Sequence, residues 1–142
     1  MKTFIGKFVL LALLLTIGAA AASAQITTQL SFKMTRSFVV GDTTLPAGSY
    51  VIRAVSGTDQ SVVEVTSTNS EIGVMVAVDL IQPDAAQAGS QLVFNKYQKV
   101  LALSQIFPGA GNQGYQLVPG HPEKLAAKAE KPAKQTVTAT GK

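Results

Sequence analysis

The sequence predicts an all-β fold, an antiparallel β-sandwich or small barrel of about seven strands, followed by a short C-terminal helix and a disordered tail. Apolar and polar residues alternate in several segments, which is the period of a strand with one buried face. Turn-forming residues separate these segments every eight to twelve residues or so, and no amphipathic helix lies between them to support parallel crossovers. The chain contains no Cys, so packing alone must stabilise the domain.

Residues 1–24 have the three parts of a cleavable signal peptide. Lys2 and Lys7 form a basic start, an apolar run follows, and Ala22 and Ala24 supply the small side chains that the peptidase requires. A membrane anchor is disfavoured, because the second half of the uncharged stretch is mostly Gly, Ala and Ser and no charged stop follows it. We expect an exported protein, periplasmic or extracellular, with no transmembrane segment after processing.

The first strand of the mature chain is expected over residues 26–40. Apolar side chains occupy its even positions, and Arg36 is the exception on the apolar face. We therefore expect a bend or bulge at Arg36. Two turns follow, at residues 41–44 and 45–48, and Gly48 is expected to need a positive φ in the second of them.

The rest of the body continues as short strands and turns. Its clearest half-buried strand spans residues 72–80, where Ile, Val and Leu recur at every second position. A hairpin is expected around Gln98 and Lys99. The other expected strands span residues 49–55, 61–66, 92–97, 100–107 and 115–118.

The composition changes after Gly120. Pro122 and Glu123 suit the first turn of a helix, which the following Leu and Ala residues extend to about Glu130. Residues 131–142 carry too few apolar side chains to offset the entropy of ordering, so we expect disorder. The predicted organisation is a signal peptide at 1–24, a β domain at 25–120 and a lysine-bearing tail at 121–142.

The positive charge is concentrated in that tail. The formal net charge of the whole chain is +4, but the β domain is close to neutral. Nucleic-acid binding needs a basic face on the folded domain, so we expect no nucleic-acid partner. Four tail lysines recur every three to four residues and would form one stripe on a helix, either simply solvated or in contact with an anionic envelope or extracellular polymer: Lys124, Lys128, Lys131 and Lys134.

We find no catalytic, cofactor-binding or metal-binding signature. His121 is the only histidine, whereas nucleophilic catalysis needs a nucleophile, a base and an orienting group together. Every acidic residue of the body except Glu64 lies at or beside a predicted turn or strand end, so a glycosidase-type carboxylate pair is disfavoured. Neither an Asp-rich calcium loop nor a Cys/His cluster is present. We expect no enzyme, no cofactor and no metal.

The aromatic residues divide into core and candidate ligand contacts. Tyr97 and Tyr115 are the candidates for stacking against a sugar or a nucleobase, with Arg36 and Lys96 as polar partners. The other group shares the positions of aliphatic neighbours and is expected in the core: Phe32, Phe38, Tyr50 and Phe94.

Several strand and turn motifs resemble those of small secreted bacterial β-rich proteins of unknown function. The motifs are FVVG at 38–41, LPAGSYVI at 45–52, LVFNKY at 92–97 and LALSQI at 101–106. The resemblance covers residues 32–117 and leaves the tail outside. It implies a shared fold and an envelope location, and it supplies no catalytic residue.

The leading hypothesis is a non-enzymatic exported β domain that acts in binding or in surface structure. The alternative is a subunit of a surface fibre or adhesin, which would self-associate by pairing the strand at 26–40 with an open sheet edge of a neighbour. A carbohydrate-active hydrolase is the third and least supported hypothesis.

Overall fold

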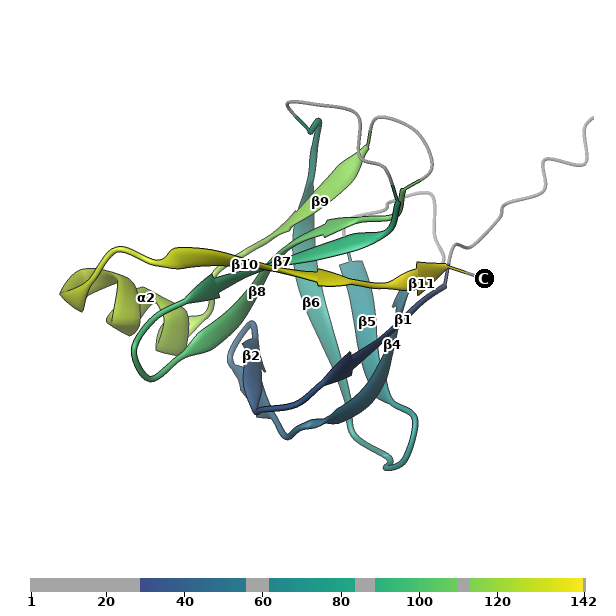
Figure 1. Cartoon of the computed structure of the whole chain (residues 1–142), viewed down its shortest axis with the longest axis horizontal. Coiled ribbons are helices and arrows are strands. Elements are labelled where there is room, and N and C mark those ends of the chain that lie inside the picture. Colours follow the sequence, from purple (N-terminus) through teal and green to yellow (C-terminus); the bar gives the residue numbers. More distant parts are fainter. Residues whose placement is uncertain (1–28, 56–61, 84–88, 110–112, 142) are drawn as a thin grey trace, which may run out of the picture.

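The structure is a computed structural model that describes residues 29–55, 62–83, 89–109 and 113–141. The signal peptide expected at 1–24 lies outside these residues. The described chain forms eleven strands and one helix, α2 (Figure 1). The strands are β1 (Leu30–Met34), β2 (Phe38–Val40), β3 (Thr43–Leu45), β4 (Gly48–Ala54), β5 (Val62–Ser67), β6 (Gly73–Ile81), β7 (Gln91–Lys96), β8 (Leu101–Phe107), β9 (Gly114–Leu117), β10 (Ala133–Thr138) and β11 (Thr140–Gly141).

The all-β prediction is confirmed, but the sheet has more strands than expected and is not purely antiparallel. Its strand order is β10-β7-β8-β9-β6-β5-β4-β1-β11, and the sheet does not close. Off this path, β2 pairs antiparallel with β3 and parallel with β8. The expectation of about seven antiparallel strands is therefore wrong, because the first long strand is divided and the short β3 and the two C-terminal strands went unrecognised.

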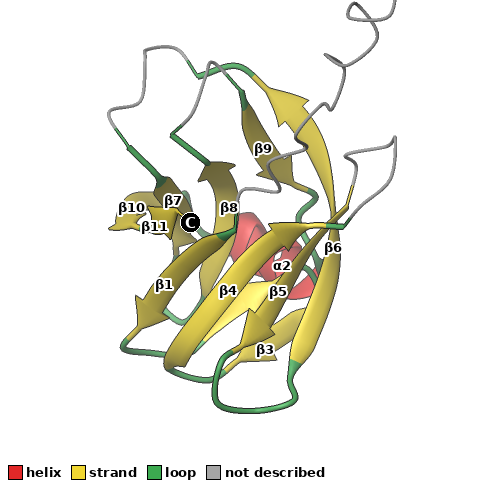
Figure 2. Cartoon of the chain, turned by 90° about the vertical axis from the view of Figure 1, so that its right-hand side faces the viewer, coloured by secondary structure: helices red, strands yellow, loops and turns green. Residues whose placement is uncertain are grey.

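The long strand β6 joins two layers. Residues 73–77 pair with β5, whereas residues 78–81 pair with β9. Figure 2 shows β1, β4, β5 and β6 side by side in one layer and β7, β8 and β9 in a second. The chain therefore passes from one layer to the other along a single strand.

Aromatic side chains fill the centre of the core between the layers. The Phe38 ring meets the rings of Phe32, Tyr50 and Phe94 edge to face, at centroid distances of 5.9, 5.1 and 5.9 Å. Edge-to-face pairs of this kind add to the stabilisation that burial gives. All four predicted core aromatics are buried, which confirms that interpretation.

The interruption expected at Arg36 is confirmed. Residues 35–37 are exposed and separate β1 from β2, which pair with different strands. The positive φ expected at Gly48 is wrong, since Gly48 begins β4. It occurs at Gly41 instead (φ 58°), in the two-residue turn between Val40 and Thr43, where tight hairpins require it.

The disorder expected for the tail is also wrong. All six residues of β10 pair antiparallel with β7, and β11 pairs with β1. Figure 1 shows this segment running from α2 across to the strand that lies beside β1. Only Ala139 is buried within it, so backbone pairing, rather than an apolar face, orders the tail. One continuous segment thus supplies both edge strands of the sheet and covers β7 and β1.

The helix α2 (His121–Ala129) forms where the sequence predicted it. Its N-cap residue, Gly120, has no capping side chain. Instead, the carboxylate of Asp42 accepts a hydrogen bond from the backbone N–H of His121 (2.7 Å). A residue of the β2–β3 turn thereby supplies the acceptor that a helix N-terminus needs, and it anchors α2 to that turn.

Candidate functional site

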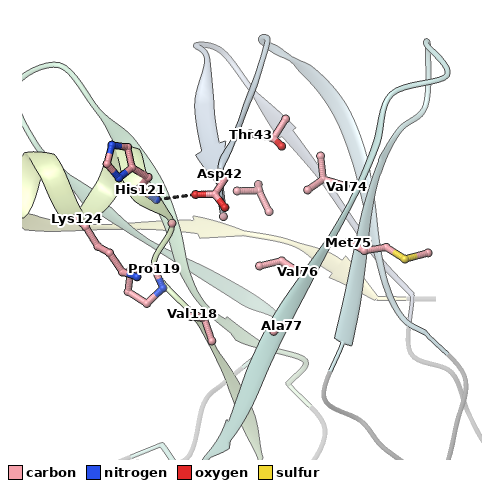
Figure 3. Close-up of a pocket in the computed structure, with 13 residues that line it drawn as sticks. Asp42, Thr43, Val74, Met75, Val76, Ala77, Val118, Pro119, His121 and Lys124 are labelled. Atoms are coloured by element: carbon pink, nitrogen blue, oxygen red, sulfur yellow. Dashed lines mark hydrogen bonds between the residues drawn. The ribbon is translucent and has the colours of Figure 1, made fainter.

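A groove opens where β9 and β6 separate. The last backbone bond between them runs from the Val118 N–H to the Ala77 carbonyl oxygen (3.2 Å). Gly120 then lies so close to Gly41 that a Cβ atom added to it would be 1.9 Å from the Gly41 oxygen. The space of about 510 Å³ that remains, which we call the β6 groove (Figure 3), is lined by residues 40–43, 74–77 and 118–121 and by Lys124.

The β6 groove is apolar on the β6 side and polar at the helix. Val74, Val76 and Ala77 line it on that side, and Val118, with 44 % of its surface exposed, lies across from them. Met75 is 65 % exposed, but its side chain lies on the outward face of β6 beside the groove. Figure 3 shows Asp42 and His121, joined by their hydrogen bond, on the opposite side of the groove from β6. Asp42 and Lys124 carry opposite charges there, so the groove suits a partly apolar ligand without a strong net charge.

A second cavity of about 590 Å³ lies between α2 and the β7–β8 turn. Leu125, which is half exposed, lines it together with residues 97–100. Its apolar lining comes from the face of α2 that the turn does not fully cover. Its only buried lining side chain, Tyr97, belongs to a hydrogen-bond network that holds the helix.

That network is built around the buried carboxylate of Glu123. Its Oε1 atom accepts hydrogen bonds from Asn95 Nδ2 (2.6 Å) and from the Tyr97 hydroxyl (3.5 Å). Lys134 in turn donates to the Asn95 side-chain oxygen. A carboxylate of α2, an amide of β7 and an ammonium group of β10 are thus connected, so the network fastens both C-terminal elements to the sheet.

The Tyr97 hydroxyl should make stability sensitive to alkaline pH. Burial, and then the adjacent Glu123 carboxylate, raise the pKa of Tyr97 above its ordinary value of 10.0. The folded state therefore retains this proton at a pH where the unfolded chain loses it, and stability should fall as pH rises past about 10. When urea unfolding is measured from pH 8 to 11, the free energy of unfolding should fall less steeply for Tyr97→Phe than for the wild-type protein.

The variant should keep part of the pH dependence, because burial also raises the pKa of Tyr50 and Tyr50 is unchanged in Tyr97→Phe. Identical pH dependence in the wild-type protein and in Tyr97→Phe would contradict the assignment.

The structure does not bring the four predicted ligand contacts together. Lys96 lies opposite Leu101, whereas Tyr115 lies opposite Ile106, which places them about 17 Å apart along β8. Arg36 lies in the exposed bend after β1.

The two tyrosines are also less accessible than expected. Tyr97 is only 4 % exposed, because its ring turns under α2 after β7 has ended. Tyr115 is half-buried and packs against the core.

The four tail lysines do not form one helical stripe. Lys124 and Lys128 lie on α2, which ends at Ala129. Lys131 lies in the connection and Lys134 in β10. All four are exposed, but they belong to three different segments.

The β6 groove was missed in the sequence, although one signal was present. Met75 and Ala77 are apolar residues on the outward face of β6, where alternation favours polar side chains. Nothing in the sequence indicates the close approach of Gly120 to Gly41, because residues so far apart in the chain are brought together only by the sheet topology.

Comparison of the chain with family models, with curated proteins and with solved structures found no match. Within the described residues, no three His, Cys, Asp or Glu side chains are grouped as a metal site requires. No helix in that part of the chain has the length and apolar character needed to cross a membrane.

Proposed function

We propose that the chain is a non-enzymatic binding domain, exported to the periplasm or the cell exterior, whose ligand occupies the β6 groove. The observation that carries this proposal is a cavity of about 510 Å³ bordered by two exposed apolar residues, Met75 of β6 and Val118, which follows β9. Exposed apolar surface next to a concave site is characteristic of binding sites. The signal-like residues 1–24 support the location.

The polar groups of the β6 groove support binding rather than catalysis. Asp42, the carboxylate that lines it, accepts the His121 N–H. This bond orients the carboxylate toward the N-terminus of α2, where it caps the helix. General base catalysis would instead need a base within hydrogen-bond reach of the reacting group.

Filling the β6 groove should weaken binding. Thr43 and Thr44 are adjacent and exposed, but only Thr43 lines the groove, since neighbouring residues of a strand point to opposite faces. We expect Thr43→Trp to weaken retention of the ligand from the organism's own envelope fraction at least about tenfold, a change of about 1.4 kcal/mol. The matched variant Thr44→Trp should retain it. Equal retention by both variants would contradict the proposal.

The exposed tail lysines provide a separate, weaker contact in this proposal. Attraction between Lys124, Lys128, Lys131 and Lys134 and an anionic polymer should fade between low and physiological salt, because exposed charges are screened. Binding in the β6 groove should persist over the same range. The salt dependence therefore separates the two contacts.

A second candidate function is self-assembly by strand exchange. The structure divides the strand at 26–40, so that strand no longer suits the role. The C-terminal segment is better placed: β10 lies at the edge of the sheet, is mostly exposed and follows a three-residue connection from α2. An identical segment of a second copy would make the same contacts with β7 and β1, which is the basis of domain swapping.

Strand exchange can be measured with introduced cysteines because the chain has none. Thr136 lies opposite Val93, at a spacing that a disulfide spans. When Thr136→Cys and Val93→Cys chains are mixed, exchange should produce the mixed disulfide dimer. As a control, Gln105→Cys, opposite Val93 in the β7–β8 hairpin, should produce none. Absence of the first dimer would exclude exchange.

A further inference from the structure

The backbone of β6 has one paired edge and one edge that is only partly paired. Ser67 N–H donates to the Ile72 carbonyl (2.9 Å), so even-numbered residues direct their backbone groups toward β5. Val118 N–H donates to the Ala77 carbonyl, so odd-numbered residues direct theirs toward β9. The two edges alternate because successive residues of a strand bond to opposite sides.

The β9 side is paired over only half of the strand. β9 pairs with residues 78–81, and Val118 adds one bond at Ala77. Met75 therefore directs its N–H and carbonyl groups into the β6 groove, and Gly73 directs its own to the same edge just beyond the groove lining. No strand of the described chain pairs with either residue there. Figure 3 shows the Met75 side chain directed away from Asp42 and His121, so Met75 borders the groove through its backbone.

We infer that the ligand of the β6 groove is an extended peptide segment of a partner protein, which adds as a strand to β6 at Gly73–Met75. This inference rests on the proposed function. An unpaired strand edge presents alternating donors and acceptors at the repeat of a β-strand, and an extended polypeptide backbone matches that array. Addition of a strand to such an edge is an established mode of peptide recognition.

The side chains around this edge of β6 determine which peptide side chains would fit. Val40 and Val76, both buried, lie on the core side of the β6 groove. Every second peptide side chain would point toward them and should be apolar. The others would point outward, beside the row formed by Met75 and the ion pair of Glu64 with Arg53 (2.6 Å).

The free protein provides the first test. Amide hydrogen exchange followed by NMR should be fast at Gly73 and Met75, whose N–H groups face the groove. Exchange should be slow at Val74 and Val76, whose N–H groups face β5. Slow exchange at Met75 in the free protein would mean that the edge is already paired, and it would overturn the inference.

The second test uses capped five-residue peptides in which Thr alternates with Ala, Val, Leu or Phe. At saturation, we expect at least one of them to slow exchange of the Met75 amide by about tenfold or more, as a new hydrogen bond requires. The same peptide N-methylated at alternate residues should fail to do so, because it cannot donate to the Met75 carbonyl. Lack of protection by every peptide, or equal binding of the N-methylated form, would overturn the inference.

A pair of proline variants tests the edge from the protein side. Met75→Pro removes an N–H that faces the groove, so the fold should persist and peptide binding should be lost. Val76→Pro removes an N–H that bonds to β5 and should disrupt the sheet. If Met75→Pro also unfolds, the N-methylated peptides still decide the question.

These outcomes separate the inference from the proposed function. Resonance shifts at Asp42 and Lys124 without protection of Met75 would leave a groove-binding domain whose ligand is not a strand. If the purified protein forms dimers that prevent the peptide from binding, a second copy of the chain occupies the groove. That result would overturn the inference that the ligand is a partner peptide. If neither the peptides nor the envelope fraction shifts any groove residue, both the inference and the proposed function fail.

Discussion

Truncation of the chain after Gly120 should lower the free energy of unfolding by about 3 kcal/mol or more. The truncated chain loses the pairing of β10 with β7 and of β11 with β1. It also loses α2, which covers Tyr97. This loss is a large share of the roughly 5 to 15 kcal/mol that stabilises a typical domain. Denaturant unfolding followed by circular dichroism measures it.

A chain that ends at Thr138 is the control for this truncation. It keeps α2 and β10 and loses only β11 and the buried Ala139, so most of the stability should remain. A disordered tail, as composition alone suggests, would leave both truncated chains as stable as the full chain. That result would contradict the pairing of β10 with β7.

Gly120→Ala should destabilise the protein by about 3 kcal/mol, the upper part of the usual range for overpacking. The added Cβ would lie 1.9 Å from the Gly41 oxygen and 2.7 Å from the Asp42 nitrogen. Both are backbone atoms of a tight turn and cannot rotate aside. The turn and the start of α2 must therefore separate, which breaks the bond between Asp42 and His121.

Gly48→Ala is a matched control, because its added Cβ would meet only the Tyr50 ring at 3.6 Å, an ordinary contact. Its unfolding midpoint should stay close to that of the wild-type protein. Equal midpoints for Gly120→Ala and Gly48→Ala would contradict the close approach of the two backbones. NMR shifts of Thr43 in Gly120→Ala should report the altered β6 groove.

Local patterns predicted the parts of the fold that depend on local physics. Period-two alternation located β4 and β6, and Arg36 marked the bend because a charged side chain cannot lie in the core face. The helix was recognisable because Pro122 and Glu123 suit its first turn. These features act within a few residues of the chain.

The parts that were missed depend on partners distant in the sequence. β10 has too little apolar character to be recognised alone, and it is ordered because β7 presents an edge to it. The β6 groove exists because β9 departs from β6 at Val118, a consequence of the contact between Gly120 and Gly41. Tyr97 was expected at the surface because nothing in its own segment indicates that α2 covers it.

The pairing of β11 with β1 affects how the chain acquires its structure. Leu30 lies opposite Gly141, so residues from opposite ends of the domain must meet, and such long-range contacts slow folding. β10 and β11 follow the other described strands in the chain, so they leave the ribosome after them, and until then the edges of β7 and β1 are uncovered. Exposed strand edges promote aggregation during synthesis. The nascent chain should therefore depend on chaperones until β11 has been made.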